Sequence, residues 1–309
     1  MKKIHASTIK KKLRENPKQF INDCEKAYNS QIKAIAYGVH RWGDEKPILL
    51  LSGPSGSGKT TTALKLSEYL NEMGTRTFTV SMDNYFKSIS SEEKALGNKV
   101  DFESPYRLDI DLLNNHMKKI ANCEEITLPD FNFKEQKRLN GPKFKRQKGD
   151  FVIFEGIHAL NPDVTGLTDG ISNGIYVSVR TRIESKSGAQ LHPEYIRLMR
   201  RIIRDKQFRG RAPMDTISMF QSVERGEDLY IMPYKERADY MVDSFIPYEA
   251  AVYKHFLEGE LDISPDSCED YQRYILMQNV LNELNEIDEC NVPSKSLIRE
   301  FIGGSGFSY

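Results

Sequence analysis

The chain has 309 residues, long enough for one large or two modest domains with a sizeable hydrophobic core. Its 44 lysines and arginines balance its 44 aspartates and glutamates, so net charge gives no attraction to nucleic acid or to a lipid surface. The four cysteines are far apart, and the longest apolar runs hold about five residues against the ~20 needed to cross a bilayer. These features argue against a zinc site, a disulfide framework and a membrane or nucleic-acid partner, and they suit a cytoplasmic protein.

Residues 1–46 precede the apolar pattern of the core. Met1–Lys18 is rich in lysine and poor in apolar residues, so we expect a frayed, basic arm with solvated charges. Apolar residues then recur at helical spacing over Phe20–Trp42, which predicts an N-terminal helix packed on the core.

From Pro47 onward, strand patterns alternate with helical patterns. Strands are predicted at Ile48–Leu51, Thr77–Ser81, Phe151–Glu155, Gly174–Val179 and Tyr240–Ile246. Helices are predicted at Thr60–Met73, Ile110–Ala121, Pro193–Phe208, Asp215–Glu224 and Ala250–Glu258. Several strands are apolar throughout, as expected for strands covered on both faces. The alternation predicts an α/β fold over residues 47–260, with a mainly parallel sheet wrapped by helices.

Residues 261–309 follow this core. Asp270–Glu286 and Ser294–Phe301 have helical patterns, and Gly303–Gly306 is typical of a flexible tail. We therefore expect a helical C-terminal extension that ends in a flexible tail.

The first core strand runs directly into a match to G-x-x-x-x-G-K-T at residues 53–60. Its glycines let the backbone curl with its N–H groups facing an anion, and the following helix adds its positive N-terminal end. Lys59 can reach the β- and γ-phosphates of a nucleotide, and the Thr60 hydroxyl can hold Mg²⁺. A glycine-rich turn could match by chance, but the flanking strand and helix favour a P-loop. The predicted nucleotide-binding residues are Gly53, Pro54, Ser55, Gly56, Ser57, Gly58, Lys59, Thr60 and Thr61.

Two carboxylates follow other predicted strands. Ligands of an open α/β sheet bind beyond the carboxyl ends of its strands, where Asp83 and Glu155 both lie. Phosphoryl transfer needs a metal between phosphates and a group that accepts the proton of the attacking hydroxyl. We assign Asp83 as the base and a metal neighbour, and Glu155 as the carboxylate that organises Mg²⁺ with Thr60. Either residue could instead cap a helix or form a turn.

The predicted helix at Pro193–Phe208 carries an arginine stripe. Arg197, Arg201 and Arg204 have spacings that place them on one helix face, and the helix runs into Arg209-Gly210-Arg211. Arginines that close over a triphosphate would stabilise charge on the transferring group. We interpret residues 180–212 as a lid of this kind, with a plain solvated surface helix as the alternative.

Several segments together resemble a known family. The chain is similar to the uridine kinase and phosphoribulokinase group of P-loop kinases over about Pro47–Tyr253. The matching segments stand in family order: Gly53–Thr61, Asp83–Phe86, Asp101–Pro105, Pro129–Phe133, Phe154–Ile157 and Arg200–Arg211. The resemblance implies a P-loop NTPase three-layer sandwich that moves the γ-phosphate of ATP or GTP to a primary hydroxyl with Mg²⁺. It also suggests a homo-oligomer, for which the sequence fixes no stoichiometry.

The resemblance also implies roles for individual residues. The catalytic set would be Asp83, Lys59 and Arg204, and Arg209 would contact the nucleotide. The acceptor side would include Asp83, Tyr85, Phe86, Phe102, Glu103, Phe131, Gln136 and Arg201. Within this set, Glu103 would hold ribose hydroxyls and Phe102 would line the sugar.

The chain departs from uridine kinases where the acceptor is read. Glu103 stands in place of the usual Asp, Phe131 in place of a Tyr, and Gln136 in place of a His that reads the pyrimidine edge. Phe131 can stack on a ring but cannot hydrogen-bond to it. His158, in a Glu-Gly-Ile-His segment, resembles the phosphoribulokinase branch, and we interpret it as a supporting residue behind the site.

The leading hypothesis from the sequence is a kinase of a nucleoside, of uridine or cytidine type by default. One alternative is a kinase of another polyhydroxylated small molecule, such as a sugar phosphate, polyol or vitamin. The other is a non-catalytic regulator gated by a nucleotide. An aromatic slot favours a base, whereas arginines facing the acceptor would favour a phosphorylated one.

Overall fold

A five-stranded parallel sheet forms the centre of the protein. The computed structural model describes residues 2–89, 101, 103–261 and 271–308. The strand order is β10-β7-β2-β6-β3, and every neighbouring pair is parallel. The strands are β2 (Ile48–Ser52), β3 (Thr77–Ser81), β6 (Phe151–Glu155), β7 (Ser172–Ser178) and β10 (Tyr240–Asp243). These are the five strands predicted from the sequence, so the predicted α/β fold is confirmed.

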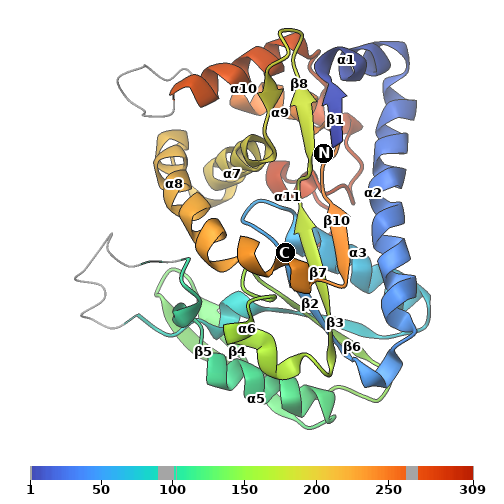
Figure 1. Ribbon diagram of the computed structural model, residues 1–309, viewed down its shortest axis with the longest axis vertical. Helices are drawn as coiled ribbons and strands as arrows, with labels where there is room; N and C mark the ends of the chain where they lie inside the picture. Colours follow the sequence, from blue (N-terminus) through green and yellow to red (C-terminus); the bar gives the residue numbers. More distant parts are fainter. Residues whose placement is uncertain (1, 90–100, 102, 262–270, 309) are drawn as a thin grey trace.

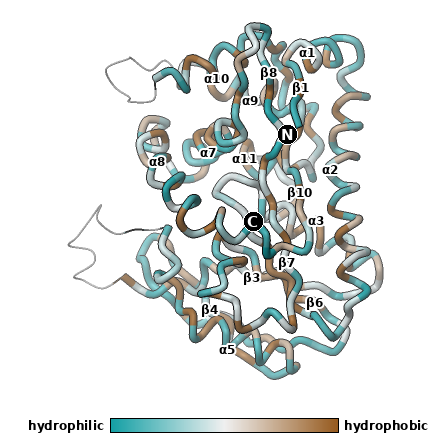
Figure 2. The backbone as a smooth tube through the Cα atoms, viewed as in Figure 1, coloured by the Kyte–Doolittle hydropathy of each residue, from teal (hydrophilic) through white to brown (hydrophobic). Residues whose placement is uncertain are grey.

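Alternating side chains of the strands enter two separate cores. Leu49, Leu51 and Ile153 belong to one buried cluster, whereas Leu50 and Phe154 belong to the other. This division follows from the period of two along a strand and accounts for the apolar run Ile48–Leu51 in β2. Helices on both faces make three layers, and the hydrophobic colour on the central strands in Figure 2 marks the middle one.

The long helices cover the sheet. Helix α2 runs along the long axis of the molecule beside β10 and α3 (Figure 1), and α5 packs in the second core. The helices are α1 (Ala6–Glu15), α2 (Pro17–His40), α3 (Lys59–Glu72), α5 (Ile110–Ala121), α6 (Pro162–Thr165), α7 (Pro193–Arg209), α8 (Pro213–Tyr230), α9 (Glu249–Leu257), α10 (Tyr271–Glu283) and α11 (Arg299–Ile302). No helix in the described ranges is long and apolar enough to span a bilayer.

The sequence did not predict a hairpin that extends beyond β3. Strands β4 (Ile126–Asn132) and β5 (Lys137–Phe144) pair antiparallel, with a register shift between Thr127 and Pro129. Gln136 closes the turn with a φ of 54°, a conformation that few residues other than glycine adopt.

The N-terminal segment is folded, so the expectation of a frayed arm was wrong. Strand β1 (Lys2–His5) pairs in parallel with β8 (Thr181–Glu184), which also pairs with β9 (Gln190–Leu191). Helix α1 then buries its few apolar side chains, Ala6, Ile9 and Leu13. Their spacing forms one narrow stripe, which is sufficient because α2 and α10 both pack against it.

The C-terminal segment is also ordered, contrary to the expected flexible tail. The helix predicted at Ser294–Phe301 is limited to the short α11. The Arg299 guanidinium donates to the carbonyl oxygens of Glu289, Val292 and Gly303 at 2.8, 2.7 and 3.2 Å. The Gly306 N–H donates to the Ser294 carbonyl at 2.8 Å. We call residues 288–308 the C-terminal strap.

Because Ile9 is fully buried, Ile9→Ala should lower the free energy of unfolding by about 2–5 kcal/mol. The exposed Thr8 on the same helix provides a control, and Thr8→Ala should change stability by less than about 0.5 kcal/mol. Urea denaturation of the full chain measures both values. Equal stability of the two variants would mean that the N-terminal segment is frayed in solution.

Candidate active site

The P-loop is built by close approach of backbones. Gly56 and Gly58 have φ values of +75° and +84°, in the left-handed region that favours glycine. A Cβ on Gly53 would overlap the carbonyl oxygen of Val177 on β7, and one on Gly56 would lie 3.0 Å from the Arg197 carbonyl on α7. The loop is therefore held between the sheet and α7.

The loop offers a cradle that fits an anion. It leads into the N-terminus of α3, whose first N–H groups carry partial positive charge. The Ser57 hydroxyl is buried with no hydrogen-bond partner among the residues that the structure describes. Lys59 donates to the Pro54 carbonyl at 3.2 Å, so its ammonium folds back across the loop. These donors match the oxygens of a nucleotide phosphate.

The strand register brings the two predicted carboxylates to the same edge. Glu155 is aligned with Leu51 of β2 on one side and with Ser81 of β3 on the other. Asp83 follows Ser81 in a 3₁₀ turn, Met82–Tyr85, whose start is capped by the Ser81 hydroxyl. The P-loop, Asp83 and Glu155 consequently lie together beyond the carboxyl ends of neighbouring strands.

Desolvation shapes the charges at this edge. It raises the pKa of Asp83, against the opposing effect of Lys59 and Arg209, and it raises the pKa of Glu155 to about 7. It also lowers the pKa of Lys59, which the charges of Glu155 and Asp83 oppose. Two half-buried carboxylates with raised pKa values suit a divalent cation, whose charge can replace a proton. Thr60, Glu155 and Asp83 could therefore hold Mg²⁺.

Helix α7 is bonded to the P-loop instead of lying on the surface. The buried Arg200 donates to both carboxylate oxygens of Glu249 at 2.8 and 3.0 Å, to the Gly56 carbonyl at 3.1 Å and to the Ser244 carbonyl at 2.7 Å.

Arg197 of the same helix forms a two-pronged ion pair with Glu227 of α8 and donates to the Ser55 carbonyl at 3.1 Å. The plain surface helix is therefore ruled out for α7, whereas the lid over residues 180–212 stays a prediction.

A single buried carboxylate gathers the other arginines. Asp205 accepts from Arg204 at 2.9 Å and pairs with Arg209 at 3.3 Å and Arg211 at 3.2 Å. Burial alone would raise the pKa of Asp205, but the positive charges of Arg204, Arg209 and Arg201 hold it below its ordinary value. Because three arginines share the single carboxylate of Asp205, the cluster keeps a net positive charge. The charge of Arg209 also lowers the pKa of Asp83 and so opposes its rise. This role of Asp205 was not predicted from the sequence, although its position beside Arg204 was a signal for it.

Arg201 lies between the P-loop and the acceptor side. Its guanidinium donates to the Ser55 hydroxyl, and its Nε has no partner among the described residues. Desolvation, together with the positive charge of Arg204, lowers the pKa of Arg201 to about 10. An enclosed cation with an uncommitted N–H is suited to binding an anionic or polar ligand.

Glu103 lies against α8. A Cβ on Gly226 would overlap the Cβ of Glu103, so only glycine leaves room for this side chain. Desolvation raises the pKa of Glu103 to about 7, while the positive charge of Arg201 opposes the rise. Burial lowers the pKa of the neighbouring His158 to about 4, so its imidazole is neutral at pH 7. Phe102 lies outside the described residues.

The predicted aromatic residues separate into two groups. Phe131 stands edge-to-face with Phe86 and Phe133, with ring centroids 5.7 and 5.1 Å apart. Tyr85, by contrast, is fully buried and its hydroxyl bonds to His116 of α5 at 3.1 Å. The expected acceptor contact of Tyr85 is therefore replaced by a role in the core.

The side-chain amide of Gln136 is used within the hairpin turn. It donates to the Phe133 carbonyl at 2.7 Å, because the positive φ of Gln136 bends the chain back at this point. The structure therefore does not bring this amide to the carboxylates of the sheet edge.

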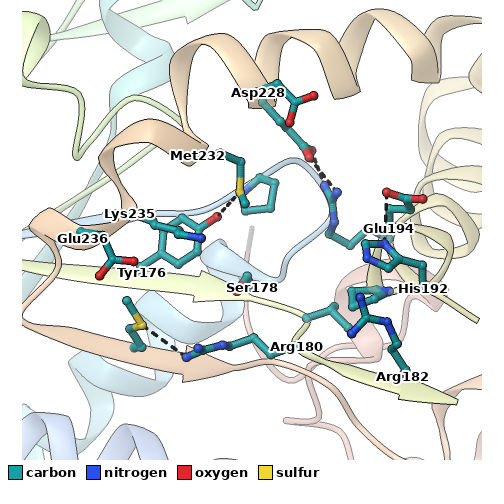
Figure 3. Close-up of a pocket in the computed structure, with 16 residues that line it drawn as sticks. Tyr176, Ser178, Arg180, Arg182, His192, Glu194, Asp228, Met232, Lys235 and Glu236 are labelled. Atoms are coloured by element: carbon teal, nitrogen blue, oxygen red, sulfur yellow. Dashed lines mark hydrogen bonds and ion pairs between the residues drawn. The ribbon is translucent and has the colours of Figure 1, made fainter. Parts of the chain in front are cut away.

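A cavity of about 360 Å³ opens beside Pro54 of the P-loop (Figure 3). It lies at the carboxyl end of β7, with Ser178, Arg180 and Arg182 on one wall and Glu194 and Asp228 on others. Of the predicted site residues that the structure describes, Pro54 alone lines it, and Arg197 of the arginine stripe lines it as well. The lining also includes Glu227, whose negative charge acts on Glu103.

The comparisons with known proteins agree with this geometry. Residues 48–249 match the model of the Phosphoribulokinase / Uridine kinase family. The chain is 31% identical to a uridine kinase of Borreliella burgdorferi (strain ZS7) over 207 residues, which cover 67% of this chain and 90% of the relative. It is 30% identical to a uridine kinase of Lactobacillus helveticus (strain DPC 4571) over 201 residues, or 64% of this chain and 87% of the relative.

A solved structure supports the fold. The crystal structure of a Silicibacter sp. TM1040 protein named as a fructose transport system kinase has a TM-score of 0.50 and 17% identity, and the match covers 65% of this chain and 95% of that one. With a P-loop, a parallel sheet and a family match over most of its length, the chain is a small-molecule kinase that belongs to the phosphoribulokinase and uridine kinase family.

Proposed function

We propose that the protein transfers the γ-phosphate of ATP or GTP to the 5′-hydroxyl of a nucleoside, of uridine or cytidine type. The observation that carries the proposal is the convergence of Lys59, Asp83 and Glu155 at one sheet edge, opposite the arginines held by Asp205. This arrangement supplies a phosphate cradle, a proton acceptor and compensating positive charge, which are the parts that phosphoryl transfer requires.

Different residues of the chain bind the donor, accept the proton and stabilise the developing charge. The P-loop N–H groups and Lys59 position the donor phosphates, and Asp83 accepts the proton of the acceptor hydroxyl. Its raised pKa makes Asp83 a stronger base than an ordinary aspartate. Arg201, Arg204 and Arg209 stabilise charge on the transferring group. Mg²⁺ held by Thr60 and Glu155 would neutralise charge between the donor phosphates.

Acceptor binding is assigned to Glu103, Phe86 and Phe131. The carboxylate of Glu103 can accept hydrogen bonds from two neighbouring hydroxyls, as in a ribose. Phe86 is partly exposed and can offer its ring to a base, and the buried Phe131 packs edge-to-face against it and holds it in place. The uridine kinase names of the relatives support a nucleoside. Arg201, whose charge acts on Glu103, supports a sugar phosphate as the second candidate acceptor.

The proposal is tested by measuring ADP release with Mg²⁺-ATP and a panel of nucleosides, sugar phosphates and polyols. We expect uridine or cytidine to stimulate release, and Asp83→Asn to lower that turnover by about 10² or more because the general base is lost. The affinity for ATP should remain nearly unchanged in this variant.

The exposed Asp111 of α5 gives a matched control, because Asp111→Asn makes the same substitution far from the sheet edge. Stimulation by a sugar phosphate or polyol and by no nucleoside would overturn the nucleoside assignment. Wild-type turnover in Asp83→Asn would remove Asp83 from the mechanism.

The pKa of Glu103, raised to about 7, predicts a pH-dependent Michaelis constant for the acceptor. The carboxylate is charged above this pKa and accepts hydroxyl hydrogen bonds, whereas protonation below it removes part of that capacity. The KM should therefore rise about tenfold as the pH falls from about 8 to about 6. Initial rates at saturating ATP measure it, and Glu103→Gln should abolish the trend. A wild-type KM that is flat over this range would contradict the assigned role.

A further inference from the structure

The C-terminal strap lies directly on the P-loop. Leu297 packs so closely against Gly58 that a Cβ on that glycine would overlap the Leu297 side chain. Leu297, Ile298 and Phe301 of the strap are fully buried. Figure 1 shows α11 beside the loop that connects β2 to α3. A segment nearly 240 positions further along the chain therefore covers the phosphate cradle.

One carboxylate of the strap bonds to the anion-binding end of α3. The Oε2 of Glu300 accepts the Thr61 backbone N–H at 3.1 Å and the Thr61 hydroxyl at 2.6 Å. Thr61 follows Lys59 and Thr60, so its N–H belongs to the first turn of the helix that leaves the P-loop. A backbone N–H and a hydroxyl at this place are donors that a phosphate oxygen of the nucleotide would use.

The charge of Glu300 also acts inside the site. It opposes the fall in the pKa of Lys59 that desolvation causes, and it adds to the rise in the pKa of Glu155. Glu300 therefore interacts with the ammonium that the donor phosphates require. A carboxylate and a phosphate cannot accept from the same two Thr61 donors, and their like charges repel.

The next residue places an aromatic ring beside the same loop. The ring of Phe301 lies 5.1 Å from the guanidinium carbon of Arg200, whose Nη1 donates to the Gly56 carbonyl. Phe301 is fully buried, so its ring anchors the strap against Arg200 of α7, next to the residue whose carboxylate bonds to Thr61.

We propose that the C-terminal strap is an internal competitor of the donor nucleotide, with the Glu300 carboxylate in the place of a donor phosphate. The inference rests on the proposed function, because it takes the P-loop as the donor site. In the structure described here the strap is closed, and the nucleotide binds only after Glu300 leaves Thr61. The apparent affinity for ATP is then the intrinsic affinity reduced by the fraction of molecules with an open strap.

The strap has an anchor outside the site that can hold it during this movement. Ser296 and Tyr248 both donate to Oε1 of the buried Glu25, at 2.6 and 2.7 Å. Lys295 pairs with Glu68 of α3 at 2.6 Å. The Arg299 bonds within the strap keep α11 attached to residues 289–303. The contact of Glu300 with Thr61 can therefore break while the strap stays docked at Glu25.

Removing the carboxylate tests the proposal. Glu300→Ala should tighten the binding of Mg²⁺-ATP about tenfold or more, measured by calorimetry on the full chain, because the competing anion is gone. Glu300→Gln, which keeps the shape but loses the charge, should also bind ATP more tightly than the wild type. Glu289→Ala is the matched control on the same strap, since its carboxylate is exposed, and it should bind ATP like the wild type.

Hydrogen exchange of the wild-type protein gives a second readout that needs no variant. Addition of Mg²⁺-ATP should increase exchange in peptides that cover residues 297–303, because the strap is displaced. Unchanged or weaker ATP binding by folded Glu300 variants, or protection of this segment by ATP, would overturn the proposal and leave the proposed function intact. No ATP binding by the wild type or by either variant would overturn both.

Discussion

The hold of α7 on the P-loop is the interaction on which the rest of the site depends. Arg200 donates to the Gly56 carbonyl while its other N–H groups are taken by Glu249 and Ser244. A buried ion pair is costly to form, and removal of one partner typically costs 3–5 kcal/mol because the other charge is left uncompensated. The pair therefore fixes one arrangement of the loop between β7 and α7. The position of Lys59 therefore depends on this arrangement of the loop.

The same helix distributes positive charge unevenly. Arg197 and Arg200 are each neutralised by a carboxylate from a later helix, and they serve the loop's position. Arg204, Arg209 and Arg211 share Asp205, so positive charge remains for a ligand. On the other side, Asp83 and Glu155 have pKa values raised by desolvation. Excess cations thus face half-buried carboxylates across the place where phosphates and a metal would bind.

Much of the fold could be predicted from local sequence patterns. The five strands are short apolar runs, and Gly53–Thr60 joins one of them to a helix, so local patterns were sufficient there. The elements that were not predicted correctly are ordered by contacts with residues far away in the sequence. Strand β1 exists because Lys2 pairs with Thr181, and the strap is ordered by contacts with Thr61 and Glu25. The arginines of α7 were recognised, but the sequence could not show that Arg197 and Arg200 are neutralised by Glu227 and Glu249, because these carboxylates lie in later helices.

The central claim is that the P-loop grips the phosphates of the donor nucleotide through Lys59 and the N–H groups of its backbone. Calorimetry of Mg²⁺-ATP binding to the wild type and to Lys59→Ala tests it most directly. We expect the variant to bind ATP at least about tenfold more weakly, because the substitution removes a charge-assisted donor from a desolvated site. Equal ATP affinities for the two proteins would contradict it.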